Sequence, residues 1–360
     1  MSKGETDILQ QQSYAMVGGD GAHSYAKNSS YQKGAVDAAK ELINESIANN
    51  LDLKLIGFNT SKAFQVADLG CSTGPNTFIA VQNIIEAVEQ KLPHETLEFQ
   101  VFFNDHYDND FNTLFKTLPS SRKYFASGVP GSFRNRLFPK SSLHFVHSSY
   151  ALHWLSRIPA EIVDRNSPVW NKDSIQCTGS VKGVTEAYAT QFENDTVSFL
   201  DARAEDIVPG GLMVILTLAM PDGIPMSETA NGVLYDVLGS CLNDLAKMGI
   251  ISEEKVESFN LPIYNATPRE VEAIIRRNKY FTIERLEELS NPVRSIPFTA
   301  QDYTVNFRAI FEEIVKNHFG KEYVDQIFYH FTERVAENLS FIEEKTLDII
   351  DLFILLKRSV

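Results

Sequence analysis

The residues best suited to chemistry lie in the stretch 68–76, Asp-Leu-Gly-Cys-Ser-Thr-Gly-Pro-Asn. Its two glycines allow the backbone to bend sharply and to approach a ligand closely, and helix amide groups follow directly after it. The stretch lacks both the Gly-Lys-Ser/Thr of a Walker loop and the pattern Gly-x-Gly-x-x-Gly, so a pyrophosphate cradle is not indicated. These features favour a nucleoside-binding turn.

Two carboxylates accompany this turn. Asp68 ends the expected strand before it, where a carboxylate can meet a cationic amino group. Asp105 ends the next expected strand, where an acid can bind ribose hydroxyls. Each acid alone is equally typical of a cap on the following helix. Combined with the glycine turn, the pair predicts nucleoside binding.

Short apolar stretches must position these groups. The expected strands are residues 63–69, 97–103, 142–147, 211–218 and 348–357. Helical segments separate them, beginning with an amphipathic helix near Asn76. This alternation predicts an α/β fold with a mostly parallel sheet, whose ligands bind beyond the carboxyl ends of the strands. We expect 348–357 to be an edge-side strand and Val208-Pro209-Gly210 to break the chain before 211–218.

The composition bounds the class of protein. The 360 residues are 43% hydrophobic and 22% charged, as in ordinary globular proteins, and no linker-like stretch divides them. A net charge of −14 opposes nucleic-acid or membrane-surface partners and favours a small-molecule partner. The scattered cysteines Cys71, Cys177 and Cys241 predict neither disulfides nor zinc. Without a signal-like N-terminus or a bilayer-length apolar stretch, we expect a cytoplasmic protein.

Five strings extend the glycine turn into a recognisable pattern. They are Ser-Tyr-Ala-Lys-Asn-Ser (24–29), Ala-Asp-Leu-Gly-Cys-Ser-Thr-Gly-Pro-Asn (67–76), Phe-Asn-Asp (103–105), Gly-Val-Pro-Gly-Ser-Phe (128–133) and Ser-Ser-Tyr-Ala-Leu-His-Trp-Leu (148–155). Over nearly the whole chain, the sequence resembles the plant SABATH family of S-adenosylmethionine-dependent methyltransferases. The resemblance implies a Rossmann-like methyltransferase core with a helical cap, usually dimeric. Its products would be methyl esters of small carboxylic acids or N-methylated xanthines.

The resemblance also implies how the chain is organised. We expect a single methyltransferase body over residues 1–360. Its core would comprise approximately 35–158, 195–221 and 308–360, and its helical cap approximately 159–194 and 222–307. The N-terminal segment 1–34 would close over the active site.

S-adenosylmethionine is the cofactor that the resemblance implies. The residues expected around its methionine part are Tyr25, Ser29, Asp68, Cys71 and Asn76. Those expected at the ribose are Asp105 and His106, and those at the adenine are Ser132 and Phe133. By themselves, Ser132 and Phe133 would be read as a loop serine and a core phenylalanine. An aromatic face such as Phe133 is nevertheless a suitable surface for an adenine ring.

Gln32 and Trp154 match the two positions that hold the acceptor carboxylate in ester-forming members. Each donates a neutral hydrogen bond, through the amide NH2 or the indole N–H. A carboxylic acid with a pKa of about 4 is already ionised at neutral pH, so no general base is expected. The residues expected to line the acceptor cavity are Gln32, Tyr150, His153, Trp154, Tyr235, Phe307 and Ile349. Core packing is the alternative for these apolar and aromatic positions.

A magnesium ion near the cap is a further implication of the resemblance. The matching positions are Asn171, Glu257, the carbonyl of Phe259, and Asn260, whose oxygen ligands suit that ion. The alternative is that Glu257 and Asn260 merely cap and solvate a turn. His144 and His147 are an odd number of residues apart on an expected strand, so they face opposite sides of the sheet and cannot chelate together.

Departures from the family pattern bear on the substrate. Val17, His153 and Tyr235 stand where salicylate-directed members have lysine, methionine and tryptophan. This weakens a salicylate reading and indicates an acid with an oxygen-bearing scaffold or an aromatic heterocycle. A carboxyl O-methyltransferase is our first hypothesis and a xanthine N-methyltransferase the second. A catalytically silent ligand-binding protein is the alternative from another class, and a nicotinamide oxidoreductase is disfavoured by the missing third glycine.

Overall fold

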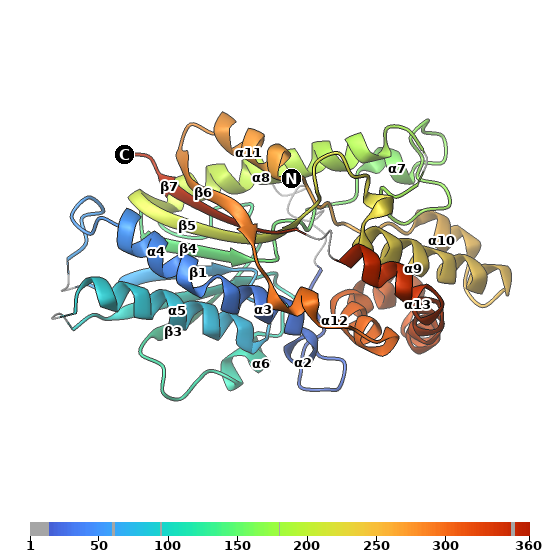
Figure 1. The fold of residues 1–360 in the computed structure, drawn as a ribbon, viewed down its shortest axis with the longest axis horizontal. Coiled ribbons are helices and arrows are strands. Elements are labelled where there is room, and N and C mark those ends of the chain that lie inside the picture. Colours follow the sequence, from blue (N-terminus) through green and yellow to red (C-terminus); the bar gives the residue numbers. More distant parts are fainter. Residues whose placement is uncertain (1–13, 60–61, 94–95, 180, 347–349) are drawn as a thin grey trace, which may run out of the picture.

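Residues 14–59, 62–93, 96–179, 181–346 and 350–360 are described by the computed structural model. Within them, seven strands form one sheet in the order β3-β2-β1-β4-β5-β7-β6 (Figure 1). The strands are β1 (Phe64–Leu69), β2 (Phe99–Asp105), β3 (Phe125–Pro130), β4 (Leu143–Ser149), β5 (Ile207–Ala219), β6 (Phe281–Leu289) and β7 (Ile350–Arg358). The pairs from β3 to β5 are parallel, and β7 is antiparallel to both β5 and β6. The predicted mostly parallel α/β sheet is confirmed.

Both faces of this sheet are buried, which explains the near-continuous apolar strands. Phe64 and Val66 of β1 belong to one hydrophobic cluster, whereas Ala67 and Leu69 belong to another. Helices α3, α4 and α5 lie along the first face, and α8 and α11 along the second (Figure 1). These helices are α3 (Ser30–Ala38), α4 (Lys40–Asn50), α5 (Pro75–Lys91), α8 (Val184–Asp206) and α11 (Pro268–Arg277).

A group of helices covers the end of the sheet at which the carboxyl end of β4 lies. In Figure 1, α9, α10, α12 and α13 lie together to the right of the strands. The bounds of the remaining helices are α2 (Tyr25–Asn28), α6 (Phe111–Lys116), α7 (Ala160–Val163), α9 (Ala230–Lys247), α10 (Glu253–Ser258), α12 (Ala300–Phe319) and α13 (Val324–Thr346). The ring of Trp154, shortly after β4, contacts Phe311 of α12, with ring centroids 5.9 Å apart. The helical group therefore covers the carboxyl ends of the central strands.

Three expectations about the elements were wrong. The strand predicted at 348–357 is not at the edge: β7 lies between β5 and β6, because its apolar residues are buried on both faces. The edge is β6, whose exposed polar residues gave no apolar signal and which falls inside the predicted cap range 222–307. Val208-Pro209-Gly210 does not break the chain, since β5 runs through it with an irregular register and Gly210 at φ +81°.

The expected ranges of core and cap do not coincide with the way the helices pack. Helices α12 and α13 lie mostly within 308–360, which was assigned to the core, yet they pack against each other and α13 packs against α9. The edge strand β3 was not predicted, because none of its residues is buried and it contains Gly128 and Pro130. Both differences have one cause: burial at an edge or in a cap depends on partners distant in sequence.

Candidate active site

The turn after β1 has the sharp geometry that its glycines predicted. Gly70 adopts φ +81°, and a Cβ there would lie 2.4 Å from the Cβ of Ala151. The backbone of Ser72 is also left-handed, at φ +50°, and its amide donates to Asp105 Oδ2 at 2.7 Å. Helix α5 then begins with Pro75. The hydrogen bond from Ser72 to Asp105 thus links the turn after β1 to the end of β2. Residue 70 of this turn has to be glycine.

Asp68 is buried and bonded within the protein. Its carboxylate accepts from the hydroxyl of Thr77 on α5, and its Oδ1 lies 2.6 Å from Nδ1 of His147 on β4. Asp68 and His147 are register partners on neighbouring strands, which explains their pairing. Asp68 also lines a pocket together with the turn.

Most residues expected around the methionine part of the cofactor converge on this pocket, which encloses about 360 Å³ including its opening. Tyr25, Cys71 and Asn76 line it with Asp68. Ser29 stands behind them, and its Oγ accepts from the amide of Asn76 at 3.0 Å. The structure therefore brings all five together.

Asp105 and His106 line an adjoining pocket of about 520 Å³. Oδ1 of Asp105 accepts from the amide of His106 at 2.7 Å, and Oδ2 accepts from Ser72. Burial raises the pKa of Asp105, while His106 and the two amide donors oppose that shift. Burial likewise lowers the pKa of His106. A fixed carboxylate in such a pocket can accept hydrogen bonds from two vicinal hydroxyls.

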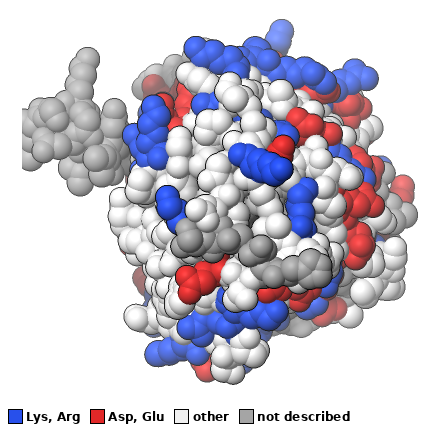
Figure 2. All heavy atoms as spheres, turned by 90° about the vertical axis from the view of Figure 1, so that its left-hand side faces the viewer, with Lys and Arg blue, Asp and Glu red and all other residues white. Residues whose placement is uncertain are grey.

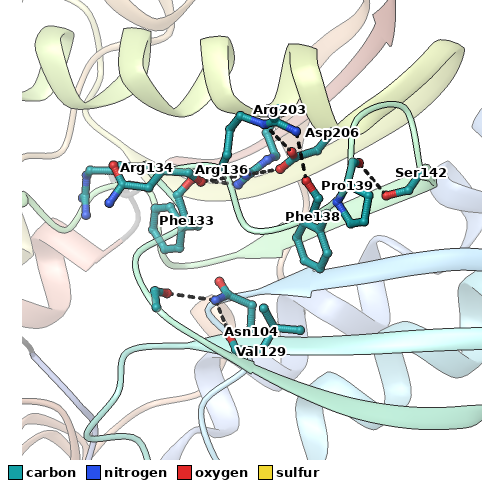
Figure 3. Close-up of polar contacts among 12 residues, drawn as sticks. Asn104, Val129, Phe133, Arg134, Arg136, Phe138, Pro139, Ser142, Arg203 and Asp206 are labelled. Carbon is teal, nitrogen blue, oxygen red and sulfur yellow. Dashed lines mark hydrogen bonds and ion pairs between the residues drawn. The ribbon is translucent and has the colours of Figure 1, made fainter.

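The loop after β3 carries the residues expected at the adenine, and buried polar groups hold it from two sides (Figure 3). The amide of Asn104 donates to the carbonyls of Val129 and Gly131 at 2.7 and 2.9 Å. From α8, the buried Arg203 donates to the carbonyl of Phe133 at 2.7 Å and pairs with Asp206 at 2.5 Å. Phe133 lines the pocket of Asp105, whereas Ser132 is buried just behind it.

A larger cavity, about 960 Å³ including its opening, lies beside these pockets. Of the residues expected to hold or enclose the acceptor, those lining it are Gln32, Tyr150, His153, Trp154, Tyr235 and Phe307. Ile349 lies outside the described residues. Gln32 also lines the pocket of Asp68, and Trp154 and Tyr150 also line that of Asp105. Shared walls place the acceptor cavity directly against the cofactor pockets.

The cavity is aromatic but contains unpartnered polar atoms. Among the described residues, the side-chain oxygen of Gln32 and Nδ1 of His153 are buried without a hydrogen-bond partner. Burial lowers the pKa of His153 to about 4, so its imidazole is neutral at pH 7. A buried polar atom without a hydrogen bond destabilises the folded protein, which favours a polar ligand that forms hydrogen bonds with these two atoms.

A buried network beneath this cavity was missed. Asp351 of β7 accepts from the hydroxyls of Tyr150 and, at 2.9 Å, Tyr31, and it lies 3.8 Å from Nε of Arg294. Tyr150 has a left-handed backbone at φ +54°, which a non-glycine residue rarely adopts. The available signal was the acid itself: Asp351 interrupts an otherwise apolar strand.

The positions expected for magnesium are only partly occupied by protein partners, since Oδ1 of Asn171 and Nδ2 of Asn260 are buried without a hydrogen-bond partner in the described residues. Nδ2 of Asn171 donates to Oδ1 of Asn260 at 2.7 Å, and Glu257 pairs with Arg165 at 2.6 Å. Phe259 is buried beside Asn260 in the sequence. The carboxylate of Glu257 already faces the guanidinium of Arg165, so it is not free to bind a divalent cation. Nor do three or more His, Cys, Asp or Glu side chains converge on a possible metal position anywhere in the described ranges.

The fold and these adjoining pockets define an α/β enzyme with a nucleoside-type site beside an apolar acceptor cavity. A family model described as SAM dependent carboxyl methyltransferase matches residues 11–359. Loganic acid O-methyltransferase of Catharanthus roseus is 48% identical over 352 residues, covering 97% of this chain and 95% of the relative. Paraxanthine methyltransferase 2 of Arabidopsis thaliana is 46% identical over 336 residues, covering 91% and 94%.

A solved structure agrees with these relatives. Loganic acid methyltransferase with SAH has a TM-score of 0.93 and 49% sequence identity, covering 96% of this chain and 99% of that one. The chain belongs to the S-adenosylmethionine-dependent carboxyl methyltransferase family, the SABATH family of the sequence resemblance. It is therefore a methyltransferase with S-adenosylmethionine as its cofactor.

Proposed function

We propose that this enzyme methylates the carboxylate of a small plant-type acid with an oxygen-bearing scaffold, giving a methyl ester. The position of Gln32 carries this proposal, because its amide lines both the pocket of Asp68 and the acceptor cavity. An acceptor group bound by that amide would lie at the boundary with the cofactor. The relatives include an enzyme named loganic acid O-methyltransferase, which supports a carboxylic acid as the acceptor.

The cofactor residues fit a nucleoside with an amino-acid tail. Close packing at Gly70 leaves the turn no room for a side chain, and the hydroxyl of Ser72, which lines the pocket, is buried without a partner in the described residues. When bound, S-adenosylmethionine supplies an electrophilic methyl group on a sulfonium. Tyr25, Ser29, Asp68, Cys71 and Asn76 would hold its methionine part. The ribose would be held by Asp105 and His106, and the adenine by Ser132 and Phe133.

On the acceptor side, Gln32 and the indole N–H of Trp154 would orient an already ionised carboxylate. Tyr235 and Phe307, whose ring centroids are 6.0 Å apart, would exclude water from the reacting oxygen. This alignment lowers the barrier without a proton transfer. His153 would serve as a neutral hydrogen-bonding group, since a pKa of about 4 makes it a weak base.

An acceptor panel tests the proposal. Purified enzyme would be incubated with methyl-labelled S-adenosylmethionine and loganic, farnesoic or salicylic acid, or with xanthines. We expect label in a base-labile methyl ester of an oxygenated acid and weak turnover of salicylate. Label entering only xanthines would overturn the ester proposal.

N-methylation of a xanthine is the second candidate. A relative 46% identical is named a paraxanthine methyltransferase, and the unpartnered Nδ1 of His153 can pair with a ring heteroatom. Catalytic silence is the third possibility; calorimetry showing no affinity for S-adenosylmethionine or S-adenosylhomocysteine would support it.

We also infer that the helical group α9, α10, α12 and α13 acts as the cap and that the N-terminal segment closes over the site. Tyr14 and Met16 support the second point, since both line the pocket of Asp105. A homodimer follows from the family resemblance, and light scattering of the purified protein tests it. The free, buried cysteines support a cytoplasmic location. None of the helices in the part of the chain that the structure describes is long and apolar enough to cross a membrane.

A further inference from the structure

Arg134 links the adenine side of the site to the acceptor side. It follows Phe133 directly, and its guanidinium lies 5.1 Å from the centre of that ring. The same guanidinium donates to the backbone carbonyl of Trp154, twenty residues further along the chain. It lines the pocket of Asp105 together with Phe133 and Trp154.

The anchor of Arg134 is a buried carboxylate. Its Nε lies 3.5 Å from Oδ2 of Asp195 on α8, with side chains only 5% and 9% exposed. Asp195 also accepts from the amide and the hydroxyl of Ser156, both at 2.6 Å. The segment 154–156 is therefore held at Trp154 by the guanidinium and at Ser156 by its counterion.

The rest of the loop is fixed independently of Arg134. Asn104 and Arg203 hold the loop backbone, and the amide of Gly131 donates to the carbonyl of Asp105 at 2.8 Å. In Figure 3 the side chain of Arg134 extends away from the Arg203–Asp206 pair. The loop backbone is thus held in place, and from it the buried guanidinium of Arg134 contacts the backbone of Trp154.

We propose that Arg134 is a positioning residue for the acceptor: by holding the carbonyl of Trp154, it sets the orientation of the indole that binds the acceptor carboxylate. This inference rests on the proposed function of Trp154. A buried arginine loses this role if its donors are removed, because lysine or methionine cannot reproduce its planar fork of N–H groups.

The two tryptophans of the chain, Trp154 and Trp170, make the test specific. In a Trp170→Phe background, fluorescence reports Trp154 alone. Arg134→Met is expected to shift the emission to longer wavelength and to increase quenching by acrylamide. It should also raise the KM of the most active panel acid about tenfold, the effect of losing one hydrogen bond to a charged group, and leave kcat less affected.

Arg136→Met is the matched control. Arg136 lies two residues further along the same loop, has a half-exposed side chain and pairs with Asp206 at 3.6 Å. It should leave both the emission and the acceptor KM unchanged. If Arg134→Met does not fold, Arg134→Lys and Asp195→Asn provide the comparison, with smaller changes in the same direction.

The outcomes separate this inference from the proposed function. Folded Arg134 variants with unchanged Trp154 emission and unchanged acceptor KM would overturn the role of Arg134. Calorimetry with S-adenosylhomocysteine on the Trp170→Phe protein should show binding that persists in Arg134→Met. Absence of binding in the Trp170→Phe protein itself would instead contradict the proposed cofactor site.

Discussion

The side chains that we expect to bind the acceptor are neutral at pH 7. The imidazole of His153 is uncharged because burial lowers its pKa to about 4, and burial raises the pKa of Tyr150 and Tyr235. Arg294 also lines the cavity but lies 3.8 Å from Asp351, whereas these neutral residues can bind an anion through N–H and O–H groups. Such binding keeps the carboxylate more nucleophilic than pairing with lysine or arginine would.

Replacing Gln32 tests this view directly. We expect Gln32→Ala to weaken acceptor binding by about 1.5–3 kcal/mol, the range for a hydrogen bond to a charged group. Affinity for S-adenosylhomocysteine, measured by calorimetry, should change much less. Asp105→Asn is the complementary variant and should weaken cofactor rather than acceptor binding. Equal losses of both affinities in Gln32→Ala would contradict its assignment to the acceptor.

His144 predicts a pH dependence of stability. Burial lowers its pKa from 6.5 to about 4, and its Nδ1 accepts from the amide of Gln65 at 2.9 Å. Between these two values the unfolded chain binds more protons than the folded one, so the free energy of unfolding falls as the pH falls. In His144→Asn this slope should be smaller by up to about 1.4 kcal/mol per pH unit. Urea unfolding at several pH values measures it, and an unchanged slope would exclude this role.

At the residue scale, local motifs alone indicated the glycine turn and its two acids, whereas the other expected site residues were named from the family resemblance. The glycine turn, Asp68 and Asp105 are recognisable because the turn and the strand ends lie within a few residues of them. Asp351 and Arg134 escaped prediction because their partners lie hundreds or tens of residues away. Which buried acid faces which tyrosine depends on strand pairing, and periodicity does not specify it.

At the scale of elements, the turn between β1 and α5 is tightly constrained. Gly70 combines a positive φ with a contact that leaves no room for a Cβ. The contact is with Ala151, in the segment that carries Tyr150 and Trp154. A change at the cofactor turn would therefore be transmitted to the acceptor residues.

Two glycine substitutions separate strain from contact. Gly57→Ala introduces a side chain at φ +64° with nothing within 4 Å, so we expect a loss of about 1 kcal/mol in stability. Gly70→Ala adds the clash and should cost about 1–3 kcal/mol more, with loss of S-adenosylhomocysteine binding. Denaturant unfolding and calorimetry measure both effects. Comparable behaviour of the two variants would show that the contact with Ala151 is unimportant.

Element types were predicted better than element positions. The strands that lead into the site were found because buried parallel strands are continuous apolar stretches. The edge strand β6 was missed because it exposes polar side chains, and β3 because none of its residues is buried and it contains Gly128 and Pro130. Strand β7 was placed at the edge because strand order is not encoded in local periodicity.

At the scale of the whole molecule, the charge of −14 acts on both substrates. On the face at the left of Figure 1, basic and acidic side chains are interspersed, so that view shows no single-sign patch (Figure 2). An anionic acceptor approaches against the net field, whereas S-adenosylmethionine, with its sulfonium and ammonium groups, approaches with it.

Ionic strength should therefore change the kcat/KM values of the two substrates in opposite directions. Raising salt from about 20 mM to about 150 mM shortens the screening length to about 8 Å. We expect kcat/KM for the acid to rise modestly and kcat/KM for S-adenosylmethionine to fall. Steady-state kinetics with each substrate varied in turn provides the measurement. A parallel change in both constants would mean that local side chains outweigh the net charge.

The place of β7 has a consequence for synthesis. This strand joins β5 to β6, yet ribosomes make it after both of them. Until β7 is synthesised, β5 and β6 both lack the strand that pairs with them in the finished sheet. Their unpaired edges can then form hydrogen bonds with other chains. Completion of the sheet therefore waits for the synthesis of β7, and chaperone demand in the cell should be greatest in the interval before it.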